Sequence, residues 1–116
     1  MEKPTEIKIE NQDGLSLLRV IGDLTSYSEP YLNDAYHQID QDPGIKSLIF
    51  VFENDAYINS GGIAALIQIL VEIRKSNRQV GIAGTSDHFI KIFKMVGISK
   101  LARIFGSLDE ALATMV

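Results

Sequence analysis

The sequence contains no cysteine, and none of its apolar stretches is long. Without cysteine the chain can form neither disulfides nor thiolate metal sites, which suits a reducing compartment. No apolar run approaches the length of a membrane span, and residues 1–4 do not begin a signal-peptide pattern. We therefore expect a cytoplasmic protein without a membrane partner.

Positive charge is also scarce. The chain has 11 Lys and Arg against 15 Asp and Glu, a formal net charge of -4, and the basic residues are scattered along it. Nucleic-acid-binding proteins concentrate basic residues on one face, so nucleic acid is not expected as the main partner. The length of 116 residues suffices for one core and is short for two. We predict one domain over residues 1–116, with residues 1–5 as a short flexible tail.

The beginning of the chain predicts a hairpin. Ile7 and Ile9 alternate with charged residues, as in a half-exposed edge strand. Residues 11–14 end in an Asp-Gly pair, which favours a tight reversal, so residues 15–21 should return antiparallel to the first strand.

Apolar residues then recur at helical spacing in four separate segments. Between these segments, residues 48–52, 80–84 and 102–105 are apolar runs typical of strands, and the first is uniform enough for a sheet centre covered on both faces. The order of elements predicts an α/β fold with a mixed, mostly parallel sheet of about five strands and about four helices. The expected helix faces are Leu32, Ala35, Tyr36 and Ile39; Ile63, Leu66, Ile67 and Leu70; Phe89, Ile92, Phe93 and Val96; and Leu108, Ala111, Leu112 and Met115.

Polar residues and glycines mark the expected ends of these helices. Thr25, Ser26 and Ser28 are alternative caps for the first helix, and Ser86 or Asp87 caps the third, which Gly97 ends. Ser107 and Glu110 have the spacing of a capping box before the fourth helix.

Residues 56–64 connect the central strand to the second helix and carry the main candidate site. Ser60 is expected at the helix start, where its hydroxyl can accept hydrogen bonds from free amides and where the helix dipole favours an added phosphate. Gly61 and Gly62 permit a tight turn and the close approach of a partner. Open α/β sheets place their sites at such strand ends, although Ser60 acting as a plain helix cap is an equally simple interpretation.

Other chemistry at Ser60 has little support in the sequence. A nucleophilic serine needs a nearby base, and only His37 and His88 are available, each with the surroundings of a surface residue. Glu53 and Asp55 lack a third metal ligand at suitable spacing, and the two glycines are not part of a Walker-type phosphate loop. We expect neither an enzyme nor a cofactor or metal site.

Three tyrosines could border Ser60. Tyr27, Tyr31 and Tyr57 offer apolar area together with a hydroxyl, a combination that is common at protein interfaces. Partial burial as packing residues explains their presence equally well, so both interpretations stay open.

Several segments together resemble the STAS domain family, in particular the bacterial anti-sigma-factor antagonists. Residues 22–27 are similar to the family's Gly-Glu/Asp-Leu/Ile-Asp stretch, and residues 59–64 match its Asp-Ser-x-Gly-Leu-Gly motif. Residues 96–101 and 108–112 look like the usual family ending. The resemblance extends over nearly the whole chain.

This resemblance implies a STAS fold and a role in partner switching. The family's phosphorylated serine corresponds to Ser60. The unmodified protein would bind an anti-sigma factor that is also a serine kinase, phosphorylation would end the binding, and a PP2C-type phosphatase would reverse it. ATP would belong to the kinase, and the chain would be a monomer or weak dimer. The expected partner-binding residues are Asp23, Tyr27, Tyr57, Asn59, Ser60, Gly61 and Gly62.

The sequence departs from the family pattern in several places. Asn59 replaces the motif's aspartate, Ala64 replaces its last glycine, and Val51 stands where many members have an aspartate. Because the departures next to Ser60 bear on kinase recognition, two alternatives remain: an unphosphorylated scaffold component of a stressosome-like complex, and a small-ligand-binding domain.

Overall fold

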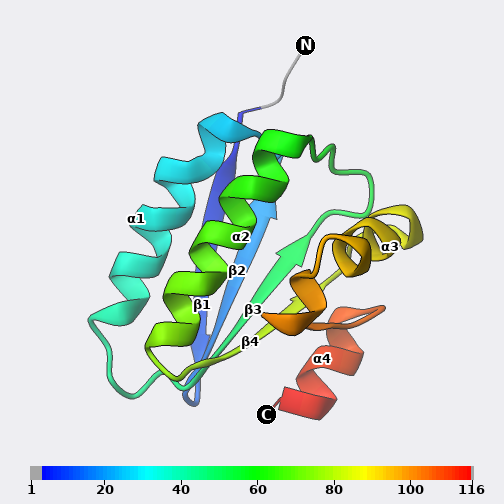
Figure 1. Cartoon of the computed structure of the whole chain (residues 1–116). Coiled ribbons are helices and arrows are strands. Elements are labelled where there is room, and N and C mark those ends of the chain that lie inside the picture. Colours follow the sequence, from blue (N-terminus) through cyan, green and yellow to red (C-terminus); the bar gives the residue numbers. More distant parts are fainter. Residues whose placement is uncertain (1–3, 116) are drawn as a thin grey trace.

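The computed structural model describes residues 4–115, which form a five-stranded sheet with helices on both faces (Figure 1). The strands lie in the order β1-β2-β3-β4-β5, so neighbours in the sequence are neighbours in the sheet. Their bounds are β1 Glu6–Gln12, β2 Leu15–Ile21, β3 Ser47–Phe52, β4 Gln79–Ala83 and β5 Arg103–Ile104. The predicted α/β class with a mixed sheet of about five strands is confirmed.

The first two strands form the expected antiparallel hairpin. Asp13 and Gly14 both have positive φ, 49° and 82°, as a two-residue turn of matching twist requires. β1 is longer than predicted because Asn11 and Gln12, expected in the turn, pair with Ser16 and Leu15. The Ser16 hydroxyl also donates to the Asn11 side chain, which helps to hold this end of the hairpin in the ladder.

The remaining strand pairs are parallel, and β3 lies at the centre of the sheet. Leu48, Ile49 and Phe50 are fully buried. Leu48 and Phe50 belong to the larger apolar cluster, while Ile49 belongs to a second cluster on the opposite face. The prediction of a central strand covered on both faces is therefore confirmed.

Within residues 4–115, four α-helices and two short 3-10 helices cover the sheet unequally. The larger cluster contains residues of α1, α2 and α3, and the smaller one contains residues of α4. Figure 1 shows α1 and α2 side by side along the sheet, with α4 set apart near the C-terminus. The helices are η1 Ser26–Ser28, α1 Glu29–Asp40, α2 Ser60–Lys75, α3 Asp87–Met95, η2 Ile98–Lys100 and α4 Leu108–Met115.

Two of the predicted helix faces need correction. Val96 was expected in the core but lies just beyond α3 and is 46% exposed, because the helix stops at Met95 and the chain turns at Gly97, with φ of 88°.

On α2 the buried stripe is rotated from the predicted one. Ile63 and Ile67 are only half-buried, whereas Ala65, Ile69 and Ile73 are buried together with Leu66 and Leu70.

The end of the chain also differs from prediction in detail. β5 contains only Arg103 and Ile104, since Ala102 and Phe105 lie outside its ladder although both are buried. Of the possible helix caps, Thr25 caps η1 and Ser86 caps α3, and the Glu110 N–H donates to the Ser107 hydroxyl as expected.

The predicted tail falls partly on residues 1–3, which lie outside the described residues. Thr5, at its other end, is attached to the fold: its hydroxyl donates to the Asp23 carbonyl at 2.6 Å and lies 2.6 Å from the Ser28 hydroxyl. Among the helices of residues 4–115, none has the length and apolar character needed to cross a bilayer.

Arg78 links the end of α1 and the loop that follows it to the start of β4. Its guanidinium donates to the Asp40 carboxylate and to the carbonyls of Ile45 and Asp42, the last two at 2.8 and 3.2 Å. The Arg78 side chain is 9% exposed. Burial acts to lower the pKa of Arg78, whereas hydrogen bonds to Asp40 and Tyr36 raise it, and the net shift is upward. The group therefore stays charged and holds the end of α1 against the start of β4.

We predict that Arg78→Leu lowers the free energy of unfolding by roughly 1–3 kcal/mol, because it removes a charged donor from the part-buried Ile45 carbonyl and Tyr36 hydroxyl as well as from the exposed Asp40 carboxylate. Arg19→Leu is the matched control. The ion pair of Arg19 with Glu10 is exposed, with side chains 39% and 55% accessible, so its loss should cost at most about 1 kcal/mol. Urea denaturation of both variants measures the difference, and equal losses would contradict the role assigned to Arg78.

Candidate functional site

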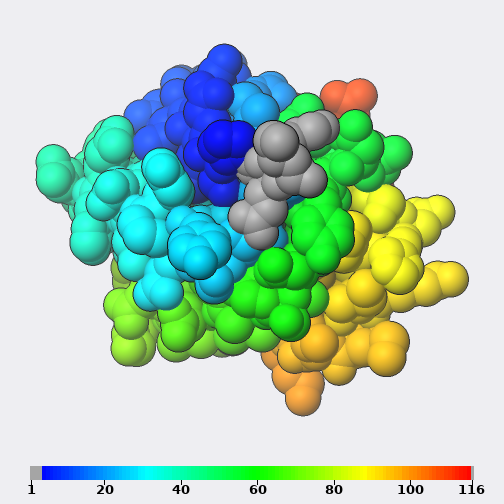
Figure 2. Space-filling view, turned by 90° about the horizontal axis from the view of Figure 1, so that it is seen from above, coloured from blue at the N-terminus to red at the C-terminus, as the bar shows by residue number. Residues whose placement is uncertain are grey.

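Two loops meet at the carboxyl edge of the sheet, beside the start of α2. The loop after β2 and the loop after β3 are joined by an isolated parallel bridge between Leu24 and Ile58. The Leu24 N–H donates to the Tyr57 carbonyl at 2.9 Å, and the Asn59 N–H donates to the Leu24 carbonyl at 3.2 Å. Figure 2 looks onto this end, where the light-blue start of α1 lies next to the green segment that begins α2. The bridge fixes the position of Ser60 relative to both loops.

The helix cap of α2 is Asn59 and not Ser60. Asn59 has an extended backbone, its Oδ1 accepts from the Gly62 N–H at 2.9 Å, and its carbonyl accepts from the Ile63 N–H at 2.9 Å. The expectation that Ser60 caps the helix was wrong because Ser60 is already the first helical residue. The sequence does contain the relevant signal, since Asn is as good a cap as Ser and stands one position earlier.

The Ser60 side chain is consequently free at the surface. The residue is exposed, and its hydroxyl makes no hydrogen bond with any residue from 4 to 115. The backbone N–H groups of Ser60 and Gly61 also make no hydrogen bond within the described chain. These amides and the positive end of the helix dipole suit an anion on the hydroxyl.

Gly61 and Gly62 let the start of α2 lie directly against the loop after β2. A Cβ on Gly62 would lie 2.1 Å from the Leu24 carbonyl oxygen, and one on Gly61 would lie 3.0 Å from the backbone nitrogen of Ser26. The atoms that approach these glycines so closely belong to the chain itself. Gly62 is buried and Gly61 half-buried, so the pair sets the geometry of the exposed residues around it.

Two aromatic side chains stand on the two loops. Tyr27, in η1, is 78% exposed, and Tyr57, directly before the bridge, is 56% exposed. Tyr31, in the first turn of α1, is 52% exposed. These values favour surface residues over core packing for all three tyrosines, and they place apolar area on the loops that flank Ser60.

The loop that carries Tyr27 is held by a dense set of hydrogen bonds. Thr25 Oγ1 accepts from the Tyr27 N–H at 3.2 Å, while the Ser28 hydroxyl accepts from the Thr25 N–H at 2.9 Å. Asp23 is half-buried, and its carbonyl accepts from the Thr5 hydroxyl. This loop is therefore held in place by hydrogen bonds within the chain itself.

Acidic side chains border this edge of the sheet. Glu53 is exposed, and its Oε1 accepts from the Gly22 N–H at 3.1 Å, which links the ends of β3 and β2. Residues 4–115 contain no group of three or more His, Asp or Glu side chains arranged to hold a metal. His37 and His88 lie on α1 and α3, and within the described residues neither one hydrogen bonds to Ser60.

A family model described as "STAS domain" matches residues 6–111 of the chain. The Anti-sigma-B factor antagonist of Staphylococcus aureus strain NCTC 8325 / PS 47 is 26% identical over 98 residues, which cover 84% of this chain and 90% of the relative.

Solved structures give the same fold. An anti-sigma factor antagonist from Mycobacterium paratuberculosis superposes with a TM-score of 0.78 at 20% identity, covering 98% of this chain and 97% of that one. The Bacillus cell fate determinant SpoIIAA in its phosphorylated form gives a TM-score of 0.67 at 12% identity, with coverage of 96% and 100%. At these identities the structures establish similarity of fold.

We predict that Gly62→Ala lowers the free energy of unfolding by about 3 kcal/mol, since the added methyl would clash with a backbone carbonyl that has no rotamer to change. Gly106→Ala is the control, because its Cβ would lie 3.6 Å from Glu110 Oε2, an ordinary contact. Thermal and urea unfolding of the two variants test this. A Gly62→Ala protein as stable as the control would rule out the close approach.

A second prediction concerns the cap of α2. Asn59→Ala should lower the free energy of unfolding by about 1 kcal/mol, because the Gly62 N–H loses its acceptor. Asn59→Asp should stay within about 0.5 kcal/mol of the parent protein, since a carboxylate caps equally well and suits the helix dipole. Urea denaturation at neutral pH measures both, and a large loss in Asn59→Asp would show that the amide has another role.

Proposed function

Because the chain belongs to the STAS domain family, we propose that it is an anti-sigma-factor antagonist. It acts in the cytoplasm as a binding protein without enzymatic activity, and its target is an anti-sigma factor that is also a serine kinase. The names of the Staphylococcus aureus and Mycobacterium paratuberculosis relatives support this role.

The single observation that carries the proposal is the free, exposed hydroxyl of Ser60 at the first position of α2. A kinase can reach this hydroxyl without unfolding the chain. Asn59, as the cap, leaves it free for modification. In the unmodified protein the hydroxyl contributes to a flat contact surface flanked by Tyr27 and Tyr57.

The remaining predicted site residues have supporting roles. Tyr27 and Tyr57 are the exposed anchors that we assign to the partner. Asp23 and Asn59 hold the two loops in place, and the buried Gly62 lets them meet. Partner binding therefore depends on a surface that is largely formed in advance.

Phosphorylation of Ser60 would act mainly on the complex. A phosphate adds a charge of about -1.5 to -2, which the free amides at the start of α2 can accommodate in the isolated protein. Inside a closely fitted interface the same charge must lose its water and meet the partner's surface, so the complex is weakened. SpoIIAA has been solved in a phosphorylated form, and this supports a phosphorylation switch in the present chain as well.

The departures from the family motif fit this scheme. Asn59 keeps the capping function of the usual aspartate, with the loss of one negative charge beside Ser60. Val51 packs against the cluster under α4, on the face of the sheet opposite α2. It therefore affects packing and does not alter the partner surface. A PP2C-type phosphatase would restore the unmodified state, and the chain would act as a monomer or weak dimer.

A scaffold role is the second candidate. In a stressosome-like complex the same exposed face could mediate assembly without any phosphorylation, and the replacement of the motif's aspartate by Asn59 favours this alternative. The two functions differ in how binding responds to charge at position 60. A small-ligand role has less support, because Tyr27, Tyr57 and Ser60 line none of the five cavities described for residues 4–115, and of the three exposed tyrosines only Tyr31 lines one.

We predict that incubation with the anti-sigma factor kinase and ATP adds one phosphate, and that Ser60→Ala abolishes the addition. Ser60→Asp should raise the Kd for the anti-sigma factor at least about tenfold, equivalent to about 1.4 kcal/mol. Ser99→Asp is the control, since Ser99 is an exposed serine on η2. Intact-mass spectrometry and calorimetric titration provide the measurements.

The outcomes separate the candidates. Phosphate on a residue other than Ser60 would overturn the site assignment. Unchanged binding by Ser60→Asp, with no phosphate transferred by the kinase, would favour the scaffold. Equal loss of binding in Ser60→Asp and Ser99→Asp would indicate a general effect of net charge and would contradict a localised switch.

A further inference from the structure

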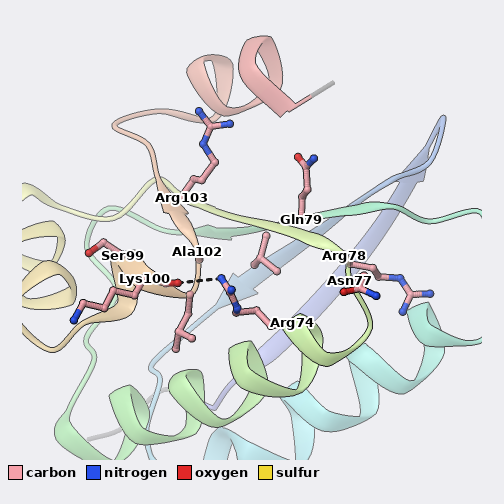
Figure 3. Close-up of a pocket in the computed structure, with 10 residues that line it drawn as sticks. Arg74, Asn77, Arg78, Gln79, Ser99, Lys100, Ala102 and Arg103 are labelled. Atoms are coloured by element: carbon pink, nitrogen blue, oxygen red, sulfur yellow. Dashed lines mark hydrogen bonds between the residues drawn. The ribbon is translucent and has the colours of Figure 1, made fainter.

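A second surface feature lies at the opposite end of α2. The amino ends of β4 and β5, the last turn of α2 and the segment around η2 enclose a groove of about 490 Å³ (Figure 3). α2 begins at Ser60 and has 16 residues, which corresponds to a length of about 24 Å. The groove is therefore separate from the Ser60 surface.

The groove is strongly basic although the chain as a whole is acidic. Ten residues line it, and none of them is Asp or Glu. Four are cationic: Arg74 from α2, Arg78 from the following loop, Lys100 from η2 and Arg103 from β5. Figure 3 shows their charged ends spread around the groove: the Arg103 guanidinium is directed toward α4, and the Lys100 amine points away from Arg74. The formal net charge of the chain is -4.

Three of these cations have no acidic partner. Arg78 pairs with Asp40 and serves the fold, but Arg74, Lys100 and Arg103 make no ion pair with any residue between 4 and 115. All three are exposed. Their charge is therefore available to an anion that enters the groove.

Two of the three are nevertheless held in position. Arg74 Nη1 donates to the Lys100 carbonyl at 3.0 Å, and Figure 3 shows this bond crossing from α2 to η2. The Arg103 guanidinium lies 5.5 Å from the centroid of the Phe105 ring. The Arg74 bond uses one of the five N–H groups of a guanidinium, so most of its donors remain.

Helix-end electrostatics explains only part of this arrangement. Basic residues in the last turn of α2 complement the helix dipole, and Lys75 does so while paired with Glu72 at 3.1 Å. Arg103 lies on a strand and is brought to the groove by the tertiary fold, so the dipole of α2 gives no reason for its charge.

We propose that this groove binds a small molecule that carries phosphate groups. Guanidinium groups match phosphate oxygens with paired hydrogen bonds, and the side chains of Asn77, Gln79 and Ser99 add neutral donors in the same lining. No aromatic residue lines the groove, so recognition falls on the phosphates, with no ring for a base to stack on. Its volume lies within the usual range for small-molecule sites, about 300–1,000 Å³.

Pyrophosphate is a suitable probe, titrated into the isotope-labelled full chain and followed by amide chemical shifts. We expect saturable shifts concentrated on residues 74–79 and 99–103, weakened by added salt as screening predicts. The triple variant Arg74→Gln, Lys100→Gln and Arg103→Gln should raise the Kd for pyrophosphate at least about tenfold, because it removes three positive charges and their charge-assisted hydrogen bonds.

The control removes the same charge elsewhere. Lys8, Lys91 and Lys94 are exposed, are absent from the groove and form no ion pair within the described residues, so their triple Gln variant has the same net charge as the groove variant. Its Kd for pyrophosphate should stay within about twofold of the parent value. Equal weakening in both triple variants, shifts centred on Ser60, or no saturable binding would overturn the proposal. Because the assay uses no anti-sigma factor, its result is independent of the proposed partner switch.

Discussion

The contact between the start of α2 and the loop after β2 is the constraint on which the site depends. A helix backbone and a loop carbonyl can lie this close only where no side chain intervenes, and Gly62 provides that gap beside Leu24. The bridge from Leu24 to Ile58 then aligns the ends of β2 and β3. As a result, Tyr27, Tyr57 and Ser60 occupy loops and a helix start whose relative positions are fixed.

This geometry gives Asn59 and Ser60 different roles: Asn59 caps the helix, and Ser60 stays accessible. A helix start needs a side-chain acceptor for its first amides, and Asn59 supplies it. Ser60 can then be accessible without loss of stability to the helix. A cap and a modification site in one residue would conflict, because modification of the hydroxyl would remove the acceptor. Their placement on adjacent residues makes Ser60 suitable for reversible chemistry.

The two ends of α2 differ in charge. Its start faces loops with carboxylates such as Glu53 and presents free amides to an added phosphate, whereas its end lies beside Arg74, Lys100 and Arg103. The two surfaces are separated by the length of the helix. A phosphate on Ser60 would therefore be recognised locally, and the basic groove would be open to a different anion. One helix thus connects two surfaces of distinct chemistry.

Local patterns in the sequence determined the hairpin, the buried β3 and the order of elements along the chain, because side-chain periodicity and turn chemistry act between near neighbours. They also located Ser60 at a helix start. Other features depend on residues far apart in the chain. The exposed Val96 and the placement of Arg74 and Arg103 along one groove follow from where each helix stops and what packs beside it. Those positions are set by the balance of packing across the whole core, which no local pattern contains, and so only the tertiary structure decided them.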